Sequence, residues 1–261
     1  MGNLGDIKRM LDKAVERYNS VEFIDSDPIL IPHQFSRKED IEIAGFLSAM
    51  LAWGQRKMII KNGMKLMEIM DFSPYEVLMD DDFLNEKELD IQKFVHRTWN
   101  GDDCMFFLKS LKNIYFNCGG LEQVFTDGFL KGNSIYDALK YFREIFLQIP
   151  HSPHSTKHLP DVTSNSSAKR LNMFLRWMVR SDENGVDFGL WKGIPMSSLM
   201  LPLDLHSGNV SRELGLLKRK QNDWKAVEEI TEVLRSFDAA DPIKYDFALF
   251  GLGVDPSHFY L

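Results

Sequence analysis

The sequence predicts an all-α fold, and three observations support this prediction. Apolar residues recur at helical spacing along most of the chain, alternating strand patterns are nearly absent, and capping residues precede several of the periodic segments. The 261 residues are 44% hydrophobic and 26% charged, which is typical of a globular protein with a sizeable core. This composition excludes a disordered, collagen-like or coiled-coil chain.

The helices follow one another with few interruptions. Residues 4–18 place apolar side chains on one face and charged side chains on the other, and residues 38–53 form an apolar run typical of a buried helix. Asn133 and Ser134 can cap the fifth of eight predicted helices, and Asp241-Pro242 opens the last one. After the two helices at 4–18 and 38–53, the remaining six, including these two, are predicted at 57–70, 102–116, 134–148, 166–180, 222–236 and 241–251.

Two non-periodic stretches separate the helical blocks. Residues 149–165 contain three of the ten prolines and predict a loop, and residues 181–203 form a second irregular stretch rich in glycine. We expect residues 1–261 to form a single two-lobed unit. Lobe A covers about 40–148, and lobe B combines about 1–39 with 149–261.

The formal net charge of −7 argues against a general nucleic-acid binder, which is more often basic. The charge is unevenly spread, because residues 76–103 hold nine acids and three bases. By contrast, residues 150–180 and 207–225 are both net basic. An acidic chain can therefore present a basic face built from its last hundred residues. Ordinary solvated helix faces would give the same pattern.

The two cysteines, Cys104 and Cys118, form no CxxC motif, which excludes a zinc or iron–sulfur site built from cysteines. The longest apolar stretch, residues 43–53, is shorter than a membrane span, and the first residues lack an apolar signal core. We therefore expect a cytoplasmic protein with no membrane partner, and a monomer.

Three histidines of the proline-rich stretch, His151, His154 and His158, are spaced three and four residues apart. On a helix this spacing would form a metal-binding face, but the prolines among them disfavour a helix. We expect a loop there, with no metal and no other cofactor.

Two residues have catalytic potential. Lys169 falls in the first turn of the helix predicted at 166–180, behind Ser166 and Ser167, which can cap it. The positive end of the helix dipole disfavours an ammonium ion there, and so favours the neutral amine that a nucleophile needs. Asp204 precedes another helix, where an aspartate is most simply an N-cap.

Together these segments resemble the helix-hairpin-helix DNA glycosylases, which include endonuclease III and the 8-oxoguanine glycosylases. Lys169 opens one helix, a Leu-Pro-Leu-Asp-Leu-His turn at 201–206 leads into another, and an Asp-Phe-Ala-Leu-Phe-Gly helix follows at 246–251. Residues 40–50 resemble an early helix of that family with an apolar Leu-Ser-Ala motif. Over nearly the whole chain the sequence looks closer still to a group of uncharacterised bacterial proteins, which are distant members of this superfamily.

The resemblance implies a DNA base-excision glycosylase with AP lyase activity, acting on a damaged base turned out of double-stranded DNA. Lys169 would attack the deoxyribose C1′ and form a Schiff base, and Asp204 would assist. Gln55 or Arg56 would fill the gap left in the base stack. The remaining DNA-binding residues would be Arg170, Arg176, Arg180, His206, Lys218, Arg219 and Lys220.

The chain departs from the family pattern in two places. Leu159-Pro-Asp-Val-Thr stands where the family hairpin has Leu-Pro-Gly-Val-Gly, so both glycines are replaced. Lys169 and Asp204 are also farther apart in sequence than is usual in the family. The alternative function is therefore a non-catalytic module that keeps the fold and binds nucleic acid or protein.

Overall fold

The computed structural model describes residues 3–80 and 82–254, and within these ranges it contains helices and no β-strand. Two isolated bridges pair His96 with Trp99 and Ser166 with Asp223. The predicted all-α class is confirmed. The more specific resemblance to a helix-hairpin-helix glycosylase stays a prediction.

The chain divides into two compact units. The discontinuous unit combines Met1–Ile24 with Asp161–Leu261, and the continuous unit is Asp25–Pro160. The predicted lobes follow the same order along the chain but have different bounds, and their assembly into one two-lobed unit stays a prediction.

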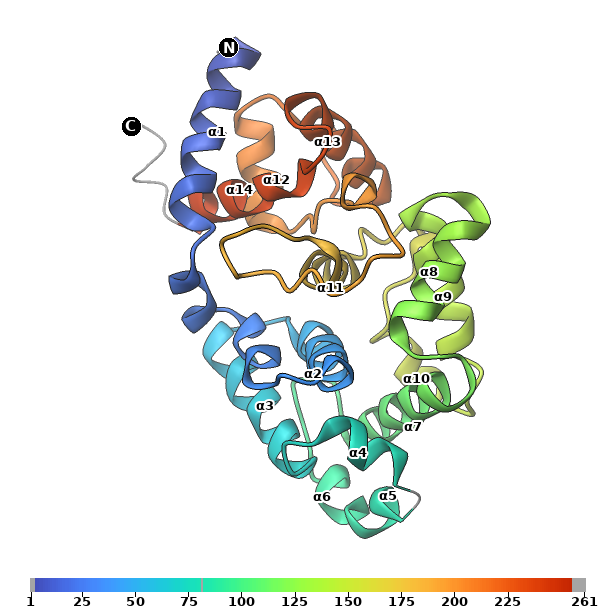
Figure 1. The fold of residues 1–261 in the computed structure, drawn as a ribbon. Helices are drawn as coiled ribbons and strands as arrows, with labels where there is room; N and C mark the ends of the chain where they lie inside the picture. Colours follow the sequence, from blue (N-terminus) through green and yellow to red (C-terminus); the bar gives the residue numbers. More distant parts are fainter. Residues whose placement is uncertain (1–2, 81, 255–261) are drawn as a thin grey trace. The chain divides into compact units, whose positions relative to one another are not determined.

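In the discontinuous unit, the first helix packs along the last one, which also packs against α12 (Figure 1). The hydroxyl of Tyr245 donates to the carboxylate of Asp12 at 2.8 Å. A Cβ atom at Gly251 would lie 2.3 Å from the ring of Tyr18, so the close approach requires glycine there. The helices of this unit are α1 (Leu4–Tyr18), α11 (Lys169–Val179), α12 (Leu205–Glu213), α13 (Trp224–Phe237) and α14 (Tyr245–Val254).

The continuous unit is built around α2, in which every residue from Ile41 to Leu51 is buried. Phe46 of this helix packs against Phe142 and Phe146, with ring centroids 5.5 Å apart in both pairs. The helices of this unit are α2 (Lys38–Leu51), α3 (Arg56–Ile69), α4 (Pro74–Met79), α5 (Phe83–Glu86), α6 (Glu88–Gln92), α7 (Gly101–Asn117), α8 (Leu121–Gly132), α9 (Ile135–Phe146) and α10 (Pro153–Thr156).

Several predicted elements need correction. The helix α8 was not predicted, because glycines surround and interrupt its apolar pattern. The predicted loop at 149–165 contains the short helix α10, which starts at Pro153, and a 3₁₀ turn at Val162–Ser164. Proline fits the first position of a helix because no partner is required for its missing N–H group.

Within the described residues, no helix combines the length and the apolar character that crossing a bilayer requires. The cytoplasmic location and the monomeric state stay predictions.

Candidate catalytic site and a histidine–aspartate cluster

The turn before α11 is closed by side chains rather than by hairpin glycines. The carboxylate of Asp161 accepts hydrogen bonds from the N–H and hydroxyl of Thr163, at 2.9 and 2.6 Å, and from the hydroxyl of Ser164 at 3.0 Å. Asn165 adopts the left-handed conformation, with φ of 64°, and its amide donates to Asp223 at 3.0 Å. An Asx turn thus stands where the resembling family has two glycines.

Lys169 is the first residue of α11 and is half-buried. Its Nζ atom lies 3.5 Å from Sδ of Met173, one turn later. The prediction that Ser166 and Ser167 cap this helix is wrong, because Ala168 occupies the N-cap with φ of 47°. Ala168 has no polar side chain, so the positive end of the helix dipole is not neutralised by a side-chain cap beside Lys169.

Asp204 is the N-cap of α12, in keeping with the simplest prediction for it. Its Oδ1 accepts from the N–H of Ser207 at 2.9 Å and from the Ser207 hydroxyl at 3.1 Å. Asn222 donates to its backbone carbonyl at 2.8 Å. Among the described residues Oδ2 of Asp204 has no hydrogen-bond donor. One oxygen therefore fixes the carboxylate while the other stays available.

The charges of Lys169 and Asp204 both influence a buried carboxyl that the sequence prediction did not include among the site residues. Asp246, on α14, is buried and ion-paired with Arg176. Burial raises the pKa of Asp246 to about 6. The charge of Arg176 opposes this rise, the negative charge of Asp204 adds to it, and the positive charge of Lys169 also opposes it. The charges of Lys169 and Asp204 thus both shift the pKa of one carboxyl in the same unit. The sequence signals for Asp246 are an acid within an apolar helix and its place at the start of the Asp-Phe-Ala-Leu-Phe-Gly motif.

Two predicted phosphate-binding arginines are internal. The side chains of Arg176 and Arg180 are 4% and 2% exposed. Both contact Asp187, at 3.1 and 2.9 Å, and Arg180 also contacts Asp182 at 2.7 Å and Asp241 at 2.8 Å. We correct the prediction for these two residues, because their guanidinium groups are buried in ion pairs rather than presented to solvent.

Two further predicted DNA-binding residues differ in exposure. Arg170, next to Lys169, is half-buried, and burial lowers its pKa to about 10. His206 is exposed, and its Nδ1 lies 3.2 Å from the carbonyl oxygen of Gly253. Their binding of DNA stays a prediction.

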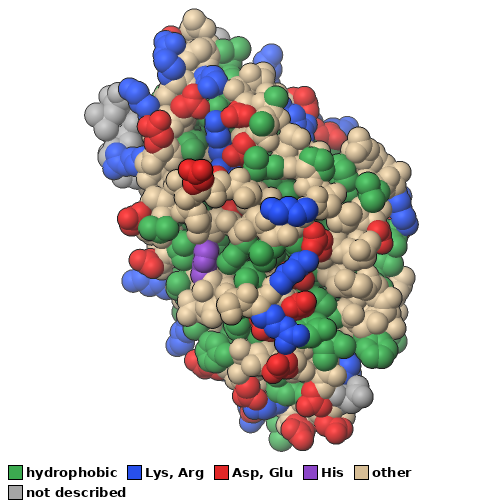
Figure 2. Space-filling model, in the orientation of Figure 1, with side chains coloured by type: hydrophobic (Ala, Val, Ile, Leu, Met, Phe, Trp, Pro, Cys, Tyr) green, Lys and Arg blue, Asp and Glu red, His purple; other side chains and the backbone are tan. Residues whose placement is uncertain are grey.

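The segment from Lys218 to Lys220 is partly available to solvent. Arg219 is paired with Asp223, with Nε 2.6 Å from a carboxylate oxygen, whereas Lys218 and Lys220 are exposed. Figure 2 shows basic and acidic side chains interspersed over the visible face of the molecule. These two lysines therefore remain candidates for contacting phosphate.

Gln55 and Arg56 stand at the start of α3, in the continuous unit, where Gln55 is the exposed N-cap and Arg56 is the first helical residue. Because they belong to the other unit, their approach to Lys169 stays a prediction.

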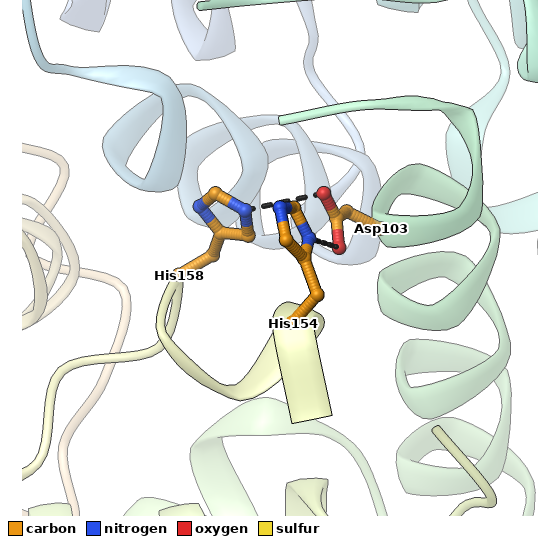
Figure 3. Close-up of side chains that lie close together, drawn as sticks. All are labelled: Asp103, His154 and His158. Carbon is orange, nitrogen blue, oxygen red and sulfur yellow. Dashed lines mark hydrogen bonds and ion pairs between the residues drawn. The ribbon is translucent and has the colours of Figure 1, made fainter. Parts of the chain in front are cut away.

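A second group of polar side chains gathers around Asp103 of α7 (Figure 3). Its carboxylate accepts from the backbone N–H of Asn100 at 3.0 Å and from the hydroxyl of Ser155 at 2.6 Å. Nδ1 of His154 lies 3.0 Å from Oδ1, and Nε2 of His158 lies 3.1 Å from Oδ2. We call Asp103, His154 and His158 the His–Asp cluster.

The expectation of no metal was based on the prolines around these histidines. The structure instead places the helix α10 there and brings two of the three histidines to one carboxylate. The third, His151, turns away, with its Nδ1 2.6 Å from the carbonyl of Ile149 and its ring against Phe106. The pairing of Asp103 with these histidines was not predicted, because Asp103 lies 51 residues before His154.

A family model described as "Protein of unknown function (DUF2400)" matches residues 27–255. The chain belongs to the DUF2400 family. Neither the curated proteins nor the solved structures yielded a match.

In this DUF2400 chain, the matched range includes both groups of residues. Lys169, Asp204 and Asp246 combine an amine with two carboxyl groups, which suits nucleophilic attack and proton transfer. The His–Asp cluster combines two imidazoles with a carboxylate, which suits a metal ion.

Proposed function

We propose that this protein is a DNA base-excision enzyme, a glycosylase with AP lyase activity, in which Lys169 is the nucleophile. One observation supports this most: α11, which begins at Lys169, is joined through the ion pair of Arg176 to the buried carboxyl of Asp246, whose pKa is also shifted by the charges of Lys169 and Asp204. A carboxyl with a pKa near neutrality beside a lysine and a second acid is frequent at catalytic sites.

In the first step, Nζ of neutral Lys169 attacks C1′ of the sugar. The bond from C1′ to the base nitrogen breaks, and the base leaves with the electron pair and takes up a proton. Asp204 stabilises the positive charge that develops on the sugar through Oδ2, while Ser207 holds Oδ1 in place.

The proton that the base takes up comes from the attached amine. The nitrogen lone pair then forms a C=N bond as the C1′–O4′ bond breaks, O4′ takes up a proton from solvent, and a protonated imine links Nζ and C1′. Loss of a proton from C2′ allows the C3′–O bond to break, which cleaves the strand. Asp246 is well suited to hold a proton near neutral pH, because burial raises its pKa to about 6. The first turn of α11 would bind a neighbouring phosphate through its backbone amides.

The alternative, a non-catalytic binding module, is favoured by one observation. The capping box between Asp204 and Ser207 is complete, so Asp204 already has a structural role.

Borohydride trapping on duplex DNA with a single abasic site separates the two functions. We expect the wild-type protein to form a covalent adduct, because borohydride reduces the imine, and Lys169→Gln to form none. Lys225→Gln is the matched control, since Lys225 is an exposed lysine in the first turn of α13 and should leave the adduct unchanged. No adduct with the wild type, or an adduct that survives Lys169→Gln, contradicts the proposal.

Asp204→Asn provides a further arm of the same experiment. Asparagine caps a helix as well as aspartate does but carries no charge. We expect this variant to fold normally and to form the adduct about 10²–10⁴-fold more slowly. A rate equal to that of the wild type would leave Asp204 as a cap alone.

A further inference from the structure

We propose that Asp103, His154 and His158 form a binding site for one divalent transition-metal ion. The site lies within the continuous unit and is independent of the function proposed for Lys169. It supplies three protein ligands and leaves the remaining coordination positions to water or another small ligand.

The donor atoms select the class of metal. Two imidazole nitrogens and one carboxylate suit Zn²⁺ and other divalent transition metals, whereas Mg²⁺ and Ca²⁺ prefer oxygen ligands throughout. Three protein ligands with an open position are typical of zinc sites that also bind a water molecule or a substrate.

The spacing of the donor atoms fits such an ion. Nδ1 of His154, Nε2 of His158 and the carboxylate of Asp103 all lie within 4.8 Å of one another. The two nitrogens lie 3.0 and 3.1 Å from different oxygens of the carboxylate. Ligands about 2.1 Å from a metal ion are separated by about 3.0–3.4 Å in octahedral or tetrahedral arrangements. An ion between the imidazoles and the carboxylate therefore requires only small movements.

Neighbouring groups hold the ligands in this orientation. The backbone N–H of Asn100 and the hydroxyl of Ser155 each bind one oxygen of the Asp103 carboxylate. The ring of His158 stacks on Trp99, with centroids 5.7 Å apart and planes 26° apart. Such outer contacts orient the ligands of metal sites and increase their affinity.

Access also suits an ion. The side chain of His154 is 40% exposed, whereas those of Asp103 and His158 are 1% and 4% exposed. An ion can therefore enter on the His154 side, where solvent completes its coordination.

Hydrogen bonds alone could also hold these side chains together, and titration with Zn²⁺ separates the two cases. The full chain is treated with a chelator, desalted and titrated by calorimetry at pH 7.5. We expect one Zn²⁺ per chain and at least 10-fold weaker binding by His154→Ala. His154 is exposed, so this variant should fold.

His151→Ala is the matched control, because His151 lies on the same segment but turns away from the cluster. It should bind Zn²⁺ as the wild type does. Co²⁺ gives a second readout, since its visible absorption reports nitrogen and oxygen ligands, and this spectrum should change in Asp103→Asn. Equal Zn²⁺ affinity of the wild type and His154→Ala, or an equal loss in His151→Ala, would overturn the proposal.

Discussion

Two groups of basic residues in the discontinuous unit have the same charge but opposite environments. Arg176 and Arg180 of α11 are buried among aspartates, whereas Lys218 and Lys220 are exposed. From the sequence, both groups contribute equally to a predicted basic face. The difference shows that a basic segment becomes a binding surface only if distant acids do not neutralise it inside the fold.

The carboxylates that neutralise Arg176 and Arg180 come from outside α11. Asp187 follows it in the irregular stretch, and Asp241 and Asp246 lie at the start of the last helical segment. Arginine suits such buried pairing because its planar guanidinium binds several carboxylates at once, whereas the strongly hydrated ammonium of lysine favours water.

The largest expected effect concerns the buried arginines. Arg180→Met removes the cation shared by Asp182, Asp187 and Asp241, and Asp187 is fully buried as a side chain. We expect the free energy of unfolding to fall by about 3–5 kcal/mol, because Asp182 and Asp241 lose their cation and Asp187 keeps only Arg176, so excess negative charge stays inside the protein. Urea denaturation followed by circular dichroism measures this change.

Arg9→Met is the matched control. Arg9 and its partner Asp6 are exposed on α1, with 73% and 58% of their side chains accessible, so the loss should stay below about 1 kcal/mol. If both variants lose equal stability, burial does not distinguish the two kinds of arginine.

A smaller effect concerns the pH dependence of stability. The pKa of Asp246 is about 6 in the folded state, against an ordinary value of 3.8 for an aspartate. Between about pH 4 and 6 the folded state therefore keeps a proton that the unfolded state has lost. The free energy of unfolding contributed by this group falls by about 2–3 kcal/mol as the pH rises through that window.

Asp246→Asn removes this titration, so the stability of the variant relative to the wild type should rise from pH 4 to pH 6. Urea midpoints at pH 4, 5, 6 and 7 for both proteins test it. A constant difference between the two proteins across this range would show that Asp246 ionises as an ordinary aspartate does.

The smallest effect on stability is expected for the exposed lysines. Lys218→Gln and Lys220→Gln should each change the free energy of unfolding by less than about 0.5 kcal/mol. If they contact DNA, each should reduce the slope of log affinity against log salt by about 1, because one fewer counterion is released. Fluorescence anisotropy with a labelled duplex at several salt concentrations measures the slope, with Lys140→Gln of α9 as a control. Unchanged slopes would exclude these lysines from the DNA contact.

Local features of the fold were predictable from the sequence. The first helix lies at Leu4–Tyr18 as its periodicity predicts, and Ser134 caps α9 by accepting from the N–H of Asp137. The start of α11 was not predictable in this way, because the left-handed conformation of Ala168 displaces it beyond the serines expected to cap it.

Contacts between distant residues were not predictable. His154 and Asp103 are 51 residues apart, and Arg176 and Asp246 are 70 residues apart. No local pattern links such pairs, since each side chain is compatible with an ordinary surface position until the fold brings its partner close. Lys169 and Asp204 were singled out by their positions at the starts of two predicted helices and by the resemblance of their motifs to a known family.

Because α1 packs against α14, it cannot complete its packing until the ribosome has synthesised the end of the chain. Asp12 and Tyr245, which form a hydrogen bond, are 233 residues apart in sequence. Residues 25–160 are all translated before α14 exists, so the continuous unit can fold while α1 still lacks its partner. The apolar face of α1, with Ile7, Leu11 and Ala14, is then uncovered for the longest time of any helix. This face is where a nascent chain of this protein is most in need of a chaperone.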